Sequence, residues 1–168
     1  MAMYALAFSA FLRVGELTVT QQNDVMLELD DCGIITEADG LTVLSIKLRH
    51  FKGNVGGTPF TIIIPASQSK YCTVQLMKNY LTFRGISKGP LFLLNNRAVT
   101  RIFFSIHLKF HLERCGYDPK YYKGHSFRIG AATAAAAAGL SDSDIQKLGR
   151  WNSNAFKRYI RIPTLFSS

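Results

Sequence analysis

Cysteine is scarce in this chain of 168 residues, and the spacing of the few cysteines excludes two common ways of stabilising a small protein. Cys32, Cys72 and Cys115 are odd in number and far apart, and no C-x-x-C pair occurs. Neither a disulfide framework nor a zinc knuckle is therefore indicated, and a reducing compartment fits this usage. A chain of this length can bury a core in one domain without covalent cross-links.

Long apolar runs are also missing. No stretch approaches the roughly 20 residues that a membrane-spanning helix needs. The apolar opening up to Leu12 lacks the basic start of a signal peptide and leads directly into Arg13 and Glu16. The sequence therefore predicts a soluble protein that is not secreted and does not bind membranes, located in the nucleus if the host is eukaryotic and otherwise in the cytoplasm.

Acidic residues are few and unevenly placed. The chain has 11 Asp and Glu against 20 Lys and Arg, a formal charge of +9 and a pI near 9.7. More than half of the acids fall in the first forty positions: Glu16, Glu28, Asp30, Asp31, Glu37 and Asp39. Such a balance is typical of a surface that meets a polyanion, so nucleic acid is the expected partner. Charge alone does not separate DNA from RNA.

Two weaker patterns do not support a cofactor. His107 and His111 are four apart on an expected helix, but no third ligand has suitable spacing and no H-E-x-x-H occurs. The glycine-rich segment 53–57 is not followed by Lys-Ser or Lys-Thr, so it is a hairpin loop rather than a phosphate-binding loop. We expect neither a metal site nor another cofactor.

The hydrophobic pattern predicts an α+β fold that is mainly helical, with a small antiparallel sheet in the N-terminal half. A mostly buried helix over 2–12 would hold Arg13 rigidly at its end. Short strands are expected at 25–29, 34–36, 41–48 and 59–64, the last two joined by a hairpin. Helices are expected at 74–83, 98–115, 127–138 and 142–149, with Ser141 as a cap, and a final helix starting near Ser153 or Asn154 would carry Tyr159.

The last third of the chain carries its most informative pattern, a tyrosine among cations. Tyr159 lies close to Lys157, Arg158 and Arg161, and it follows the segments HSFR at 125–128 and LGRW at 148–151. A tyrosine hydroxyl, with an ordinary pKa of about 10, attacks a phosphodiester only if neighbours accept its proton and neutralise the developing phosphate charge. Arginine, histidine and an indole N–H can provide this.

A second part of the pattern lies far upstream, where Arg13 and Glu16 are three residues apart. Glu16 could fix the guanidinium so that its planar fork meets a phosphate with two N–H groups. Six residues occur in the order found in the catalytic domain of tyrosine recombinases, also called phage-type integrases: Arg13, Lys52, His125, Arg128, Trp151 and Tyr159. The chain resembles that family from about Tyr4 to Arg161. The motifs HSFRIGAAT and LGRW…YIR most resemble those of recombinases of eukaryotic mobile elements, the Cryptons and tyrosine-recombinase retrotransposons.

The resemblance implies a site-specific DNA recombinase that works through a 3′-phosphotyrosyl intermediate, without metal or ATP. Tyr159 would attack the scissile phosphate, and Arg13 and Arg128 would neutralise the transition state. His125 would assist removal of the tyrosine proton. Without the motif, His125 could equally be a helix cap and Arg13 a structural partner of Glu16.

Trp151 and Lys52 would complete the site. The Trp151 indole N–H would hold a phosphate oxygen, or the ring would simply anchor the core. Trp151 lies eight positions before Tyr159, where many family members have nine, so a tighter or offset last turn is expected. Lys52, at the expected hairpin tip, would protonate the leaving 5′ oxygen, with Lys47 as the competing candidate.

The resemblance also implies double-stranded DNA as the partner, with self-association on DNA from dimer to tetramer. Further DNA contacts are expected from Arg49, Lys123, Arg150, Lys157, Arg158 and Arg161. The chain would be a single catalytic domain over 1–168, without the helical DNA-clamping domain that usually precedes it. Two alternatives stay open: a domesticated, non-catalytic DNA-binding module, and a nicking enzyme similar to type IB topoisomerases.

Overall fold

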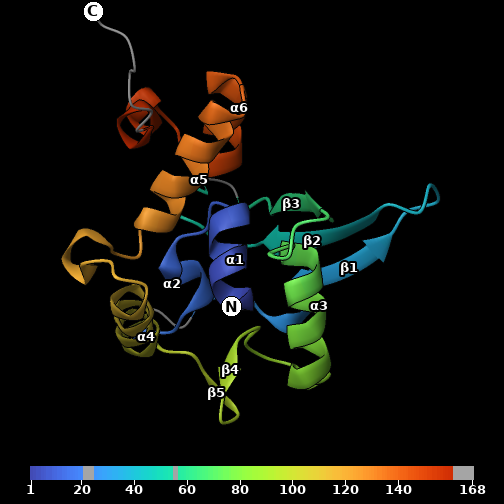
Figure 1. Ribbon diagram of the computed structural model, residues 1–168. Coiled ribbons are helices and arrows are strands. Elements are labelled where there is room, and N and C mark those ends of the chain that lie inside the picture. The colour runs from blue at the N-terminus through green and yellow to red at the C-terminus, as the bar shows by residue number, and fades with distance from the viewer. Residues whose placement is uncertain (21–24, 55–56, 161–168) are drawn as a thin grey trace, which may run out of the picture.

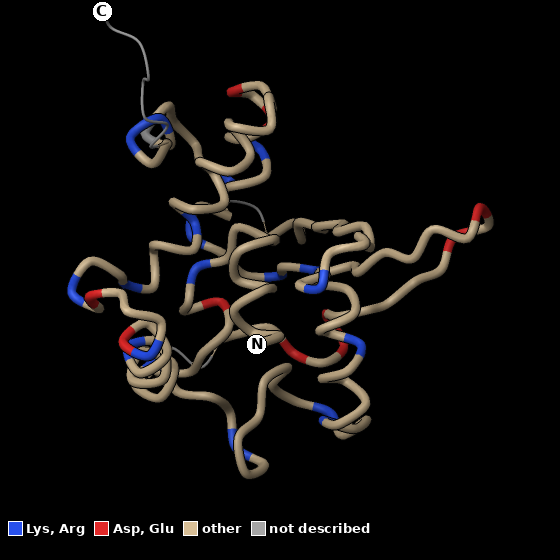
Figure 2. The backbone as a smooth tube through the Cα atoms, viewed as in Figure 1, with Lys and Arg blue, Asp and Glu red and all other residues tan. Residues whose placement is uncertain are grey.

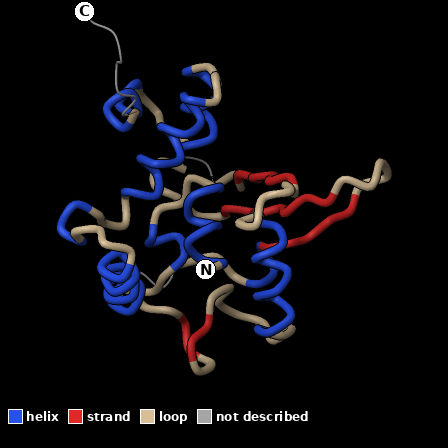
Figure 3. The backbone as a smooth tube through the Cα atoms, viewed as in Figure 1, coloured by secondary structure: helices blue, strands red, loops and turns tan. Residues whose placement is uncertain are grey.

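The computed structural model describes residues 1–20, 25–54 and 57–160, and it confirms an α+β fold that is mainly helical (Figures 1 and 3). The sheet and the first helices precede a helical second half. In chain order the elements are α1 (Ala2–Ser9), α2 (Val14–Leu17), η1 (Leu29–Asp31), β1 (Cys32–Thr36), β2 (Thr42–Leu48), β3 (Phe60–Pro65), α3 (Thr73–Arg84), β4 (Leu93–Leu94), β5 (Arg97–Ala98), α4 (Arg101–Arg114), η2 (Pro119–Tyr121), α5 (Ser126–Ala137), α6 (Asp142–Gly149) and η3 (Asn154–Tyr159). Within the described residues, no helix combines the length and the apolar character needed to cross a membrane.

Helix α1 is the central element, packed against both α3 and α5 (Figure 1). Leu6 and Ala7 are fully buried, which explains why this helix has no polar face. It ends at Ser9, three residues earlier than the sequence predicted, because Phe11 adopts a left-handed conformation with φ of 51°. The Leu12 N–H then donates to the Ala7 carbonyl at 2.9 Å, which closes the helix end in a Schellman motif.

Arg13 begins a second helix instead of ending the first. It is the N-cap of α2, and its backbone N–H donates to the Glu16 carboxylate at 2.7 Å. The prediction that the 2–12 helix holds Arg13 was therefore wrong in detail. Arg13 is fixed by the capping contact with Glu16, which satisfies a backbone donor that the start of a helix leaves free.

The sheet is antiparallel in the order β1-β2-β3. Leu44, Ile46 and Leu48 alternate along β2 and are all buried, so one face of the sheet covers the core. Ile46 lies opposite Ile62 of β3, and the hairpin between these strands carries Lys52, as the sequence predicted.

The strand expected at 25–29 is absent. In the described part of this segment, only Glu28 forms an isolated bridge, to Pro90, and Leu29 opens the short helix η1. The physical reason is the acidic cluster that follows: the Asp31 carboxylate accepts the Glu28 N–H at 3.1 Å and turns the chain into a helical turn.

The helices of the second half match the expectation except at one start. The hairpin β4–β5 takes the first residues of the predicted 98–115 helix, because Asn95 and Asn96 both adopt positive φ, as a tight hairpin turn requires. Thr100 then caps α4 by accepting the Phe103 N–H at 3.1 Å. Helix α6 has the predicted bounds, and Ser141 caps it by accepting the Asp144 N–H.

Two clusters of buried side chains hold these elements together. The larger one joins α1, the sheet and α3. The smaller one consists of Phe11, Ala131, Ala132, Ile145 and Phe156. Phe156 is fully buried in it, so the short helix η3 is anchored to α5 and α6. This places Tyr159 at the end of a segment that the core fixes.

Candidate active site

One groove, with a volume of about 770 Å³, collects side chains from both halves of the chain. Its walls come from the start of α2, the tip of the β2–β3 hairpin, the start of α5 and the segment between α6 and η3. All six residues expected in the catalytic set line it: Arg13, Lys52, His125, Arg128, Trp151 and Tyr159. The fold therefore brings together residues that lie up to 146 positions apart in the sequence.

Glu16 lies beneath the groove and is 8% exposed. Its Oε1 accepts from Nη1 of Arg13 at 3.3 Å, and its Oε2 accepts from Nη2 of Arg150 at 3.0 Å. The Arg13 side chain is still 32% exposed, so it is held by Glu16 and open to the groove at the same time. This is the geometry in which a carboxylate orients a guanidinium toward an anion.

Arg128 is almost fully buried at the floor of the groove, with its guanidinium 4.4 Å from the centre of the Trp151 ring. Its Nη1 donates to the Phe11 carbonyl and its Nη2 to the Gly149 carbonyl, both at 2.6 Å. Burial, together with the charges of Arg13 and Arg150, lowers the pKa of Arg128 to about 10, so the group is still protonated at neutral pH. A guanidinium has five N–H donors, so two such bonds leave capacity for an anion.

Arg150 differs from what the sequence predicted. We expected a DNA contact, but its side chain is 2% exposed and its guanidinium faces inward to Glu16 and to the carbonyls of Ala10 and Phe11. Burial also lowers the pKa of Arg150, while the Glu16 carboxylate raises it. The left-handed backbone of Arg150, with φ of 55°, turns the side chain inward, although Arg150 still lines the groove, so its contact with DNA stays a prediction.

Trp151 and Tyr159 form one aromatic unit. Their ring centres are 5.6 Å apart at an interplanar angle of 31°, and Phe156 packs on the same indole at 5.8 Å. Trp151 thus packs against the smaller core cluster and lines the groove as well. The carbonyl of Tyr159 accepts from Oγ1 of Thr133 at 3.1 Å, which ties the end of η3 to α5. Helix η3 is a 3₁₀ helix, the tighter last turn expected from the eight-residue spacing.

His125 and Lys52 lie on opposite walls. His125 is the exposed N-cap of α5, so both it and Arg128 lie in the first turn, near the positive end of the helix dipole. Lys52 is exposed at the hairpin tip and lines the groove, whereas Lys47 is exposed on β2 and is not among the residues that line it. The geometry favours Lys52 over Lys47.

The tip that carries Lys52 touches the segment before η3. A Cβ at Gly53 would lie 2.9 Å from Nδ2 of Asn152, and Gly53 has φ of 91°, a backbone conformation that favours glycine.

Comparison with known proteins shows which folds this chain resembles. No family model matches the chain. It is 29% identical, over 98% of its length, to an integrase/recombinase XerD homologue of Selenomonas ruminantium, and it spans 48% of that relative. Among solved structures, a XerH site-specific recombinase bound to a palindromic difH substrate matches with a TM-score of 0.69 at 16% identity, over 97% of this chain and 42% of that one. The Tn1549 transposon integrase in complex with circular intermediate DNA matches with a TM-score of 0.59 at 16% identity, over 98% and 54%.

The fold is that of a tyrosine recombinase catalytic domain. The mixed architecture, with a small antiparallel sheet and a helical second half, is the one expected from the sequence resemblance. Since the chain spans about half the length of the relative and of the structures that it matches, the activity of those longer proteins is a proposal for this chain.

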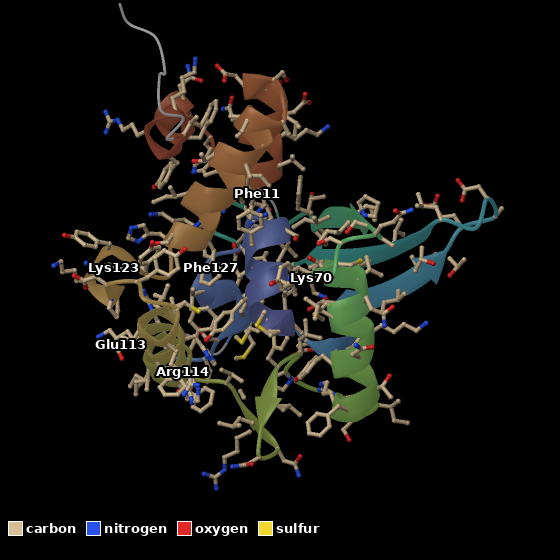
Figure 4. The ribbon with its side chains drawn as sticks, viewed as in Figure 1. Phe11, Lys70, Glu113, Arg114, Lys123 and Phe127 are labelled. Carbon is tan, nitrogen blue, oxygen red and sulfur yellow. The ribbon has the colours of Figure 1, made fainter. Side chains whose placement is uncertain are left out.

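The remaining cations expected to contact DNA are dispersed over this recombinase fold, as Figure 2 shows for all Lys and Arg. Lys123 is exposed on the groove wall, on the connection that leads to α5 (Figure 4). Arg158 is exposed on η3. Arg49 is paired with Asp31 at 2.6 Å, and Lys157 with Asp142 at 2.7 Å, so both already have a carboxylate partner. Arg161 lies outside the described residues.

Two further features of the groove were not expected from the sequence. Arg101, the first residue of α4, is exposed and lines the groove; its only sequence signal was its place after the Thr100 cap. Phe11 supplies a carbonyl to both Arg128 and Arg150, and nothing in the apolar pattern marks that role. Among the described residues, no three His, Cys, Asp or Glu side chains lie close enough together to hold a metal ion.

Proposed function

We propose that this chain cleaves and rejoins DNA strands in site-specific recombination, through a covalent 3′-phosphotyrosyl intermediate. One observation carries the proposal: a single groove is lined by six residues from distant parts of the sequence, namely Arg13, Lys52, His125, Arg128, Trp151 and Tyr159. A phosphoryl-transfer site needs a nucleophile, cations that neutralise the phosphate, and a proton donor for the leaving group.

Each residue then has a chemical task. The Tyr159 hydroxyl attacks the scissile phosphorus, His125 accepts its proton, and the phosphate becomes linked to the tyrosine oxygen at the 3′ side of the break. Arg13 and Arg128 neutralise the pentavalent transition state, and the Trp151 indole N–H donates to a phosphate oxygen. Lys52 gives a proton to the departing 5′ oxygen.

The reverse reaction completes the cycle. A 5′-hydroxyl attacks the phosphotyrosine, the tyrosine oxygen leaves and regains its proton, and the strands are rejoined. The number of phosphodiester-type bonds is unchanged, so neither ATP nor a metal ion is needed in this scheme.

Double-stranded DNA is the proposed partner, supported by the charge of +9 and by the DNA bound in the similar structures. Exchange between two duplexes needs four cleavages, so we further propose self-association on DNA, from dimer to tetramer. The sequence motif HSFRIGAAT supports a finer proposal, that the chain comes from a mobile element. In a eukaryotic host it would act in the nucleus, and otherwise in the cytoplasm.

The experiment is covalent trapping on a nicked duplex, in which the short strand diffuses away after cleavage. Wild type and Tyr159→Phe are incubated with the DNA in the presence of EDTA and separated on a denaturing gel. A shifted band from wild type that Tyr159→Phe lacks supports the proposal. Tyr121→Phe is the matched control, because Tyr121 is 74% exposed outside the groove, and it should give the wild-type band.

The other outcomes identify the alternatives. A folded wild type that binds DNA and gives no adduct would indicate a non-catalytic DNA-binding module. An adduct together with relaxation of supercoiled plasmid, but without exchange between two sites, would indicate a nicking enzyme of the topoisomerase type.

A further inference from the structure

Arg150 is a buried arginine at the centre of the site that the proposed mechanism does not use. Its side chain is 2% exposed, and its guanidinium donates to the Glu16 carboxylate and to three backbone carbonyls, those of Ala10, Phe11 and Leu148. Nη2 reaches Oε2 of Glu16 at 3.0 Å and the Phe11 carbonyl at 3.2 Å, and Nη1 reaches the Ala10 carbonyl at 3.3 Å. A lysine could not serve this set, because only the planar fork of a guanidinium presents donors in several fixed directions.

The acceptors of Arg150 are shared with the two arginines assigned to the phosphate. Glu16 accepts from Arg13 through its other oxygen, at 3.3 Å. The Phe11 carbonyl accepts from Nη1 of Arg128 at 2.6 Å. Arg150 therefore shares the Glu16 carboxylate with Arg13 and the Phe11 carbonyl with Arg128.

The backbone adopts rare conformations to make this arrangement. Phe11 and Arg150 have φ of 51° and 55°, in the left-handed region that side chains other than glycine rarely adopt. Each follows a helix end closed by a Schellman pair: the Leu12 N–H donates to Ala7, and the Trp151 N–H donates to Gln146 at 3.0 Å. Figure 4 labels Phe11 at the end of α1, next to α5. Backbone strain of this kind is concentrated at functional sites, where the surrounding contacts maintain it.

We propose that Arg150 is a positioning residue: through the Glu16 carboxylate and the Phe11 carbonyl it sets Arg13 and Arg128 in one geometry and links them to the segment that carries Tyr159. The inference rests on the proposed function. Trp151, which follows Arg150 directly, lies on Arg128 and against Tyr159, so the same residue fixes the start of the segment that holds the nucleophile.

The test is a double-mutant cycle between the two ends of the buried contact. Arg150→Lys and Glu16→Gln keep size and polarity, and they are made singly and together, with Arg97→Lys as the matched control on the exposed strand β5. Two quantities are measured: the single-turnover rate of adduct formation on the nicked duplex, and the Kd for the same duplex. Far-UV circular dichroism and thermal unfolding establish that each variant is folded.

We expect each single variant to lower the rate about 10²-fold, as a misplacement of about 1 Å can do, with Kd within about threefold of wild type. The double variant should be within about threefold of the slower single variant, because both changes break one connection. Losses that multiply to about 10⁴-fold would show that Arg150 acts independently of Glu16 and would overturn the inference.

The remaining outcomes are also decisive. A wild-type rate in Arg150→Lys or in Glu16→Gln would overturn the inference. If Arg150→Lys does not fold, Arg150→Gln takes its place in the same cycle, and the same comparison of single and double variants decides. If wild type forms no adduct, the proposed function itself fails. If wild type forms the adduct and the variants do not behave as expected, only the inference fails.

Discussion

Replacement of Gly149 by alanine should damage both stability and chemistry. A Cβ at Gly149 would overlap the six-membered ring of Trp151 more closely than any van der Waals contact allows. The indole would have to move, and it is the ring against which Arg128 and Tyr159 pack. The Gly149 carbonyl also accepts from Arg128, so a shift of this backbone would disturb a buried charged hydrogen bond.

The magnitude follows from these contacts. Overpacking of a well-packed site costs about 1–3 kcal/mol. Complete loss of a hydrogen bond to a charged group costs about 1.5–3 kcal/mol. Partial loss of the hydrogen bond from Arg128 adds to the cost of overpacking, so we expect a decrease of roughly 3 kcal/mol in the free energy of unfolding. For a chain of this size, that lowers Tm by roughly 6–12 °C.

The assay combines urea unfolding with adduct formation at a temperature where the variant is folded. The control is Gly33→Ala, since a Cβ at Gly33 meets nothing within 4 Å, and it should change stability by less than about 0.5 kcal/mol. We expect adduct formation by Gly149→Ala to fall about 10²-fold. Wild-type stability together with wild-type adduct formation in Gly149→Ala would refute the packing that places Trp151 between Arg128 and Tyr159.

Three further predictions concern the proton donor, the charge and a helix cap. Lys52→Ala should slow cleavage by about 10²–10⁴-fold, and a substrate with sulfur in place of the 5′ bridging oxygen should restore the rate, because a thiolate leaves without a proton. Lys47→Ala should react at the wild-type rate, and the reverse pattern would assign the proton transfer to Lys47. DNA affinity, measured by fluorescence anisotropy, should fall linearly on a log–log plot against salt; an affinity independent of salt would contradict electrostatic binding by the basic groove. Ser141→Ala should lower the free energy of unfolding by about 1 kcal/mol, because Ser141 accepts the Asp144 N–H at the start of α6; the neighbouring Ser143→Ala should have little effect, and equal losses in both would argue against the cap.

Much of this architecture was predictable because local patterns and tertiary packing agree. Helix α6 has the predicted bounds, since its Ser141 cap and the glycine at its end are sequence signals with fixed geometry. The six groove residues were found through their order and type, which the fold then brings together.

At the end of α1 and at Arg150, the structure differs from the expectation because of a backbone conformation that no pattern encodes. Phe11 and Arg150 adopt a left-handed conformation without being glycine, so α1 ends early and the Arg150 side chain turns inward. The nine-residue spacing common in the family also leads from Tyr159 back to Arg150, not Trp151. Sequence alone could not separate these neighbours, whereas the structure gives Arg150 internal partners and Trp151 the contact with Tyr159.

The buried arginines have a consequence for how the protein should respond to its ligand. Arg13, Arg128 and Arg150 gather around the Glu16 carboxylate, and none of the described residues that line the groove is acidic. The unliganded fold therefore carries uncompensated positive charge at its centre, and mutual repulsion contributes to the lowered pKa of Arg128. A phosphate diester in the groove would supply the missing counter-charge. The folded state would then be more stable with DNA than without it, so the proposed substrate would also act as a structural component of the site.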